Sequence, residues 1–133
     1  MITIDANNKT LGRVASAAAK ALLGKGAADF AKNVVSPEEV KVTGVEGMRI
    51  SGDKATQKEY IRYSGYAGGQ KRETYESLMQ RHPERVIEHA ITRMLPKNKL
   101  GRQMLKKLKV YAGPEHPHQA QKAKPFEIVQ ISQ

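Results

Sequence analysis

Residues 2–24, ITIDANNKTLGRVASAAAKALLG, decide the fold class of this chain. Ile2–Asp5 alternates apolar and polar side chains, as a short strand does, and residues 6–9 have the composition of a turn. Apolar side chains then recur at helical spacing, with Thr10 as the predicted N-cap and Gly24 as the C-terminal stop. A strand, a turn and a helix in this order make the first half of a βαβ unit.

The rest of the chain continues this alternation of strands and helices. Short strands are predicted over residues 40–43, 48–50 and 108–111, and helices over residues 75–81, 83–95 and about 99–107, the last one capped by Asn98. This order favours an α/β fold with a parallel sheet, in a single domain that we expect to span residues 1–113. Three prolines predict an extended arm over residues 114–133, with too little apolar surface to order by itself. Residues 126–133 alternate again, as an added strand or a contact with another protein would, and the alternative for this stretch is disorder.

Composition narrows the function classes. The 133 residues carry 23 Lys and Arg against 13 Asp and Glu, a net charge of +10, so a nucleic acid is the leading partner class. Leu, Ile, Val and Phe together make up only 27 residues, which leaves a small core. Without cysteine there is no disulfide framework or Cys-ligated zinc site. An apolar run of membrane-spanning length and a secretory signal profile are both missing, so we expect a cytoplasmic protein.

The segment between Glu88 and Glu115 has no acidic residue. Its basic side chains are Arg93, Lys97, Lys99, Arg102, Lys106, Lys107 and Lys109. On the predicted helix, Arg102, Lys106 and Lys109 follow one face at i, i+4 and i+7, opposite the apolar side chains. Such a ridge is typical of phosphate binding, although a solvated basic face has the same pattern.

A second predicted binding surface is the flexible Gly-rich loop at residues 65–69 with its flanks. The candidate side chains are Arg62, Tyr63, Tyr66, Lys71 and Arg72. Glycine allows close approach of the backbone to phosphate, tyrosine can stack on an unpaired base, and the cations supply charge. The alternative is an ordinary mobile loop.

Catalytic and metal-binding patterns are weak. The Gly-rich loop lacks the Gly-Lys-Ser/Thr of a nucleotide-binding P-loop, and the first strand–helix turn lacks the dinucleotide fingerprint. His116 and His118 lie in a Pro-rich segment without a third metal ligand nearby, which favours polar contacts over a metal site. We therefore predict a protein that is not an enzyme and has no cofactor, metal or small-molecule substrate.

Two longer motifs resemble a known family. Residues 94–102, MLPKNKLGR, followed by LKVYAG at 108–113 and EHPH at 115–118, resemble the signature region of the large-subunit ribosomal protein L13 family. Further matches at residues 5–6, 9–13, 64–69 and 81–88 follow in the same order and extend the resemblance over nearly the whole chain.

This resemblance implies a three-layer α/β/α fold around a small parallel sheet of about four strands. It also implies a structural role in the large ribosomal subunit, with binding of 23S rRNA, support of early subunit assembly and contacts with neighbouring ribosomal proteins. The rRNA contacts that it implies fall on the matched segments, at Lys9, Arg13, Lys97, Asn98, Lys99, Arg102, His116 and His118.

Two other function classes compete with this interpretation. A nucleotide-dependent α/β enzyme would share the opening strand, turn and helix, but it needs a phosphate loop and placed acid and base groups. A membrane-surface module would use the basic helix near residues 98–109, but this helix has no aromatic anchor and only a narrow apolar stripe.

Overall fold

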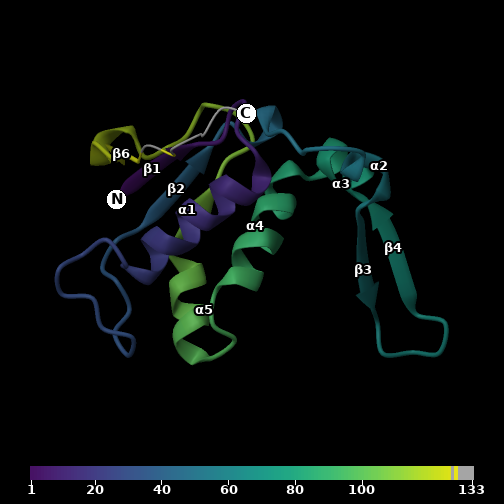
Figure 1. Cartoon of the computed structure of the whole chain (residues 1–133), viewed down its shortest axis with the longest axis horizontal. Coiled ribbons are helices and arrows are strands. Elements are labelled where there is room, and N and C mark those ends of the chain that lie inside the picture. The colour runs from purple at the N-terminus through teal and green to yellow at the C-terminus, as the bar shows by residue number, and fades with distance from the viewer. Residues whose placement is uncertain (127, 129–133) are drawn as a thin grey trace.

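The computed structural model describes residues 1–126 and 128, and it shows a sheet covered by helices, with a hairpin that projects to one side (Figure 1). The strands are β1 (Ile2–Asp5), β2 (Val40–Thr43), β3 (Glu59–Tyr63), β4 (Gln70–Thr74), β5 (Leu108–Val110) and β6 (Lys124–Pro125). The helices are α1 (Leu11–Leu23), α2 (Lys54–Gln57), α3 (Tyr75–Arg81), α4 (Pro83–Met94) and α5 (Lys99–Lys106), with short 3-10 turns η1 (Val45–Gly47) and η2 (Gln119–Gln121).

The main sheet is parallel. Among the described residues it has four strands in the order β5-β2-β1-β6, and Val40 lies between Ile2 of β1 and Leu108 of β5. Each of these parallel connections is long enough to carry the helices that cover the sheet. The predicted α/β class and the small parallel sheet are confirmed.

The core lies between this sheet and the helices. Ile4, Val40 and Val42 are fully buried on the face of the sheet that α1 covers. Alanines on the buried face of α1 allow close packing, and α4 lies beside α1 and buries Ile87 and Ile91 (Figure 1). The spacing that predicted these helices therefore corresponds to burial on one side.

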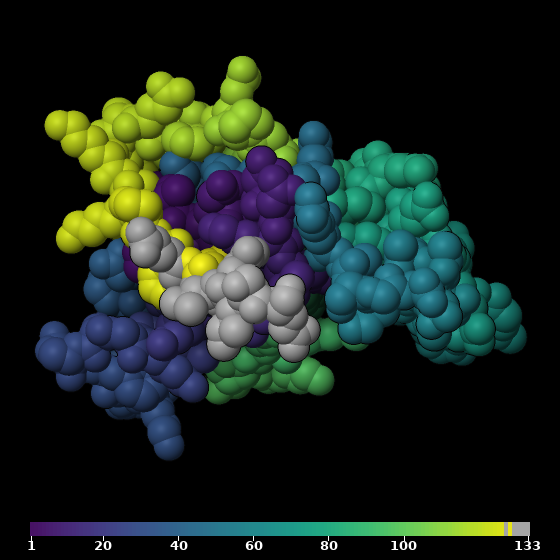
Figure 2. Space-filling model, turned by 45° about the horizontal axis from the view of Figure 1, so that its top comes forward, coloured from purple at the N-terminus to yellow at the C-terminus, as the bar shows by residue number. Residues whose placement is uncertain are grey.

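The other face of the sheet is covered by the segment that follows β5. Lys41 and Thr43 alternate with the core valines along β2, so they face away from α1, and both are nevertheless buried. Figure 2 shows the yellow-green segment after β5 running past the purple N-terminal strand. The Lys41 ammonium nitrogen lies 2.8 Å from Nε2 of His116 in this segment.

The described part of the arm is ordered against the domain, which differs from our expectation of an arm unable to order by itself. The backbone N–H groups of Lys124 and Phe126 donate to the carbonyl oxygens of Met1 and Thr3, at 3.1 and 2.8 Å. The arm is held by hydrogen bonds to the open edge of β1, a source of order that apolar composition does not reveal. The boundary at residue 113 stays a prediction, and residues 127 and 129–133, to which most of the alternating C-terminal pattern belongs, lie outside the described residues.

One local prediction was wrong, and one hairpin was not predicted. Residues 48–50 do not form a strand; η1 precedes them, and a single bridge joins Arg49 to Thr10. The segments on either side of the Gly-rich loop, for which no strand was predicted, form the antiparallel hairpin β3-β4. Its side chains are mostly exposed on both faces, so no hydrophobic alternation marks these strands in the sequence.

Candidate nucleic-acid interface

Helix α5 presents the exposed cations of the L13-like motif. The Asn98 side chain caps the helix, because its Oδ1 accepts a hydrogen bond of 2.8 Å from the backbone N–H of Gly101. Met104 is buried against the body of the molecule, whereas Arg102 and Lys106 are exposed on the opposite side of the helix. Lys97 and Lys99 are also exposed, just before and at the start of α5. This helix therefore holds several cations in fixed positions toward solvent.

The ridge does not continue to Lys109 as a helix. Helix α5 ends at Lys106, and Lys109 belongs to β5, where it lies opposite Lys41 in the sheet register. Lys107 is half-buried, and its ammonium group donates a 2.6 Å hydrogen bond to the carbonyl oxygen of Ser36. The prediction of one helical ridge through Lys109 is thus wrong, because the chain changes from helix to strand within two residues.

The Gly-rich loop forms the tip of the hairpin. Tyr63 and Tyr66 are 67% and 80% exposed there, and their rings are available to a partner. Backbone hydrogen bonds from Ser64 to Gly69 and from Gly69 to Tyr66 close the loop into a defined turn. Behind the tip, Arg62 lies opposite Lys71 across the two strands.

The remaining candidates near the N-terminus lie at another part of the molecule. Arg13 is exposed in the first turn of α1 and lines a groove of about 650 Å³ with Arg49, Lys54 and Lys58. Lys9 is half-buried in the preceding turn, where its carbonyl oxygen accepts the backbone N–H of Arg49. Neither Glu nor Asp lines this groove among the described residues.

His116 and His118 have partners within the protein. Besides the contact with Lys41, Nδ1 of His116 accepts a 3.2 Å hydrogen bond from the backbone N–H of His118. Nε2 of His118 lies 2.7 Å from the hydroxyl of Tyr111. Both histidines are half-buried, and their contacts attach the arm to the domain.

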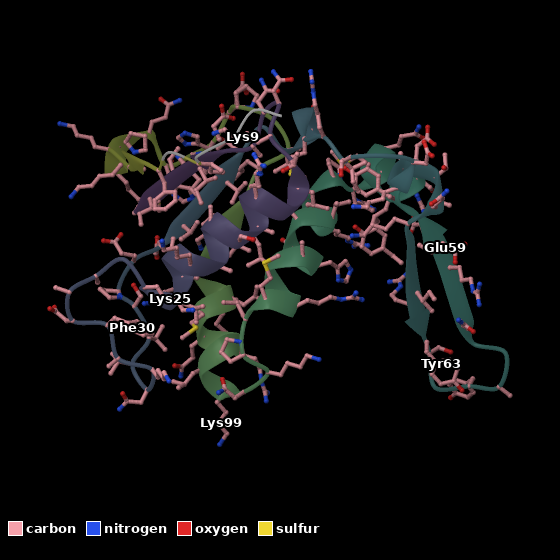
Figure 3. The ribbon with its side chains drawn as sticks, in the orientation of Figure 1. Lys9, Lys25, Phe30, Glu59, Tyr63 and Lys99 are labelled. Atoms are coloured by element: carbon pink, nitrogen blue, oxygen red, sulfur yellow. The ribbon has the colours of Figure 1, made fainter. Side chains whose placement is uncertain are left out.

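The sequence-predicted residues therefore do not form one patch. Lys9, Tyr63 and Lys99 lie at three separate parts of the molecule, the last two on the hairpin tip and at α5 (Figure 3). Such an arrangement can contact several segments of a large polyanion at once, and it does not enclose a small substrate.

Sequence reasoning missed a second basic groove, between the hairpin and α4. This groove, of about 470 Å³, is lined by both strands of the hairpin and by side chains of α3 and α4. Arg85, His89 and Arg93 follow one face of α4 at i, i+4 and i+8. This helical spacing can be detected in the sequence. The groove exists only because the hairpin forms its other wall.

Among the described residues there is neither a metal-binding cluster nor a membrane-spanning helix. His, Asp and Glu side chains do not gather there in the threes that a metal ion would need. No helix in this part of the chain is long and apolar enough to cross a membrane.

Fold and surface together define a small, basic α/β protein whose exposed cations lie on several elements. The family model for ribosomal protein L13 matches residues 1–117 of this chain. The chain belongs to this family, and the resemblance drawn from the sequence is confirmed.

Related proteins match this chain over nearly its full length. A large ribosomal subunit protein uL13 of Mycolicibacterium smegmatis is 53% identical over 130 residues, which is 98% of this chain and 88% of the relative. The protein of the same name in Symbiobacterium thermophilum is 53% identical over 94% of this chain and 87% of the relative. The one in Thermus thermophilus is 50% identical over 96% of this chain and 91% of the relative. The chain is thus a ribosomal protein of the L13 family and not an enzyme.

Proposed function

We propose that this chain is a structural constituent of the large ribosomal subunit in the cytoplasm, where it binds 23S rRNA and supports early subunit assembly. Family membership supports the location, since the relatives are large-subunit proteins. The observation that carries rRNA binding is the exposed face of α5, where Lys99, Arg102 and Lys106 point to solvent within a segment without acidic residues.

The mechanism is neutralisation of phosphate charge by a folded scaffold. Each phosphate contact releases condensed counterions, which makes binding strong at low salt and weaker as salt rises. Because α5 is packed on the domain through Met104, its cations keep a fixed relation to the hairpin and to the groove at Arg13. Separate RNA segments can then be held at a defined geometry, which is the contribution to assembly that we propose. Neighbouring ribosomal proteins are proposed partners on the remaining surface.

The test is binding of 23S rRNA by the double variant Arg102→Gln/Lys106→Gln over a range of salt concentrations. Both side chains are exposed, so each change should alter the free energy of unfolding by only about 0.5 kcal/mol. We expect weaker binding and a salt dependence flatter by about 0.7–0.9 log units for each phosphate that is no longer neutralised.

The matched control is Lys20→Gln/Lys122→Gln, which removes the same charge from exposed positions that lie neither on α5 nor in the grooves described above. It should keep the salt slope of the wild type. A folded Arg102→Gln/Lys106→Gln protein with an unchanged slope would show that this face of α5 does not touch rRNA. In lysate, the wild-type chain should co-sediment with large subunits through a moderate salt wash, and a chain found mainly in the soluble fractions would contradict the proposal.

A further inference from the structure

The basic groove beside the hairpin, hereafter the hairpin groove, has two walls from distant parts of the sequence. One wall is the hairpin face on which Tyr60 and Glu73 lie opposite each other, next to the opposed pair Arg62 and Lys71. The other wall is the face of α4 that carries Arg85, His89 and Arg93, continued on α3 by Arg81. The rings of Tyr60 and His89 stack with their centres 5.7 Å apart, and this contact ties the two walls together at one point.

The groove carries an excess of positive charge that the described residues do not neutralise. Glu73 pairs with Arg81, and on the hairpin Arg72 pairs with Glu59 at 3.5 Å. Arg62, Lys71, Arg85 and Arg93 have no carboxylate partner among the residues that the structure describes. Several like charges around one hollow repel one another unless an anion lies between them, so the site fits a polyanionic ligand.

Tyr60 forms the hairpin side of this groove. Its ring lines the groove and stacks on His89, while its hydroxyl is buried without a hydrogen-bond partner within the described part of the chain. Burial, with a smaller contribution from Tyr75, raises the pKa of Tyr60 although Arg93 opposes the shift, so the hydroxyl keeps its proton. Because this hydroxyl is covered, a ligand in the groove contacts the ring and not the hydroxyl.

The volume and the exposed tip select the form of the nucleic acid. A cleft of about 470 Å³ has the size of sites that hold small molecules, so it accommodates nucleotides. At the end of the hairpin, the exposed Tyr63 and Tyr66 offer aromatic faces on which only unpaired bases can stack. Resting on the proposed function, we propose that the hairpin groove holds the backbone of an unpaired RNA strand, with bases stacked on the tyrosines of the tip.

The test measures fluorescence anisotropy of the full chain with two probes, a labelled uridine-rich single strand and an RNA duplex of the same length. The wild type should bind the single strand more tightly than the duplex. For Arg85→Gln/Arg93→Gln we expect single-strand affinity to fall by on the order of tenfold, with a salt slope flatter by about 1.4 log units because two phosphates are no longer neutralised. The control is again Lys20→Gln/Lys122→Gln, which should bind the single strand with the wild-type salt slope.

Two further variants separate stacking from charge. Tyr63→Leu/Tyr66→Leu should lower single-strand affinity by about tenfold while leaving the salt slope unchanged, because stacking releases few counterions. Tyr60→Phe keeps the ring and removes only the covered hydroxyl, so it should bind the single strand as the wild type does, without altering the circular dichroism spectrum. Loss of the preference for single strands in the tip variant would support the stacking assignment.

The outcomes distinguish this inference from the proposed function. If Arg85→Gln/Arg93→Gln binds the single strand as the control variant does, the hairpin groove is not an RNA site, even when the α5 variant no longer binds 23S rRNA. If the groove variant fails on the single strand while the α5 variant still binds 23S rRNA normally, the groove inference stands and the α5 surface is excluded. Tighter binding of the duplex by the wild type would overturn the assignment to unpaired RNA.

Discussion

At the residue scale, Lys41 is a buried basic side chain whose partner lies in the arm. Its Nζ lies 2.8 Å from Nε2 of His116, and Nδ1 of the same ring accepts the backbone N–H of His118. Burial lowers the pKa of Lys41 below 10.5, because desolvation disfavours the charged form of the amine.

A pH dependence of stability follows from the lowered pKa. The unfolded chain binds a proton at Lys41 up to pH about 10.5, whereas the folded chain releases it earlier, so this group contributes stability as pH rises. We expect the melting temperature of the wild type, relative to Lys41→Met, to increase between the lowered pKa of Lys41 and pH 10.5. Thermal unfolding of both proteins across this range checks the prediction, because other groups titrate alike in both. Parallel pH profiles would mean that Lys41 keeps its ordinary pKa in the folded protein.

At the element scale, the turn between α4 and α5 depends on one glycine. Gly101 is buried in the first turn of α5, and a Cβ atom at this position would overlap the carbonyl oxygen of Pro96. The turn backbone can approach the helix only because this side chain is missing. Gly12 in α1 differs, since a Cβ there meets no other heavy atom within 4 Å.

These two glycines predict opposite effects of alanine. In a helix, alanine is favoured over glycine by about 1 kcal/mol, but overpacking against a backbone oxygen costs about 1–3 kcal/mol. Gly101→Ala should therefore lower the free energy of unfolding by up to about 2 kcal/mol, whereas Gly12→Ala should leave it unchanged or raise it by up to about 1 kcal/mol. Urea denaturation of both variants measures this difference. Equal effects at the two positions would show that the turn moves away from α5 at little cost.

At the scale of the whole molecule, the arm forms one layer of the protein. Its described part contacts Lys41 through His116, pairs with the edge of β1 and places Phe126 against the core. Ending the chain after Gly113 removes this layer, including hydrogen bonds worth about 1 kcal/mol each, and exposes an unpaired strand edge.

We expect this truncation to lower the melting temperature by on the order of 10 °C, for a loss of about 3 kcal/mol. A chain that ends at Ile128 keeps the described part of the arm and is the matched control. Calorimetry of the full chain, the chain that ends at Gly113 and the chain that ends at Ile128 measures the three melting temperatures. A truncated domain that melts with the full chain would show that the arm contributes nothing to folding, which is the behaviour that its apolar content alone predicts.

Sequence alone determined several of the regular elements. The helical stripe of α1 and the apolar spacing of α4 were predicted correctly, because one-sided burial leaves a period in the sequence. The Asn98 cap of α5 and the position of β2, which is buried on both faces, were also predicted correctly. The charge excess and the acid-free segment around α5 are likewise properties of the sequence. They indicate a polyanionic partner by themselves, and the motif at residues 94–102 indicates the family.

Only the tertiary structure decided which of these charges lie together. Strands β3 and β4 have no buried face, so they leave no period in the sequence, and their pairing creates the wall opposite Arg85 and Arg93. The partner of Lys41 lies 75 residues away, in a segment whose order comes from backbone hydrogen bonds to β1. Both features depend on polar contacts between segments that lie far apart in the sequence. The sequence does not distinguish a polar side chain that faces water from one that contacts a partner.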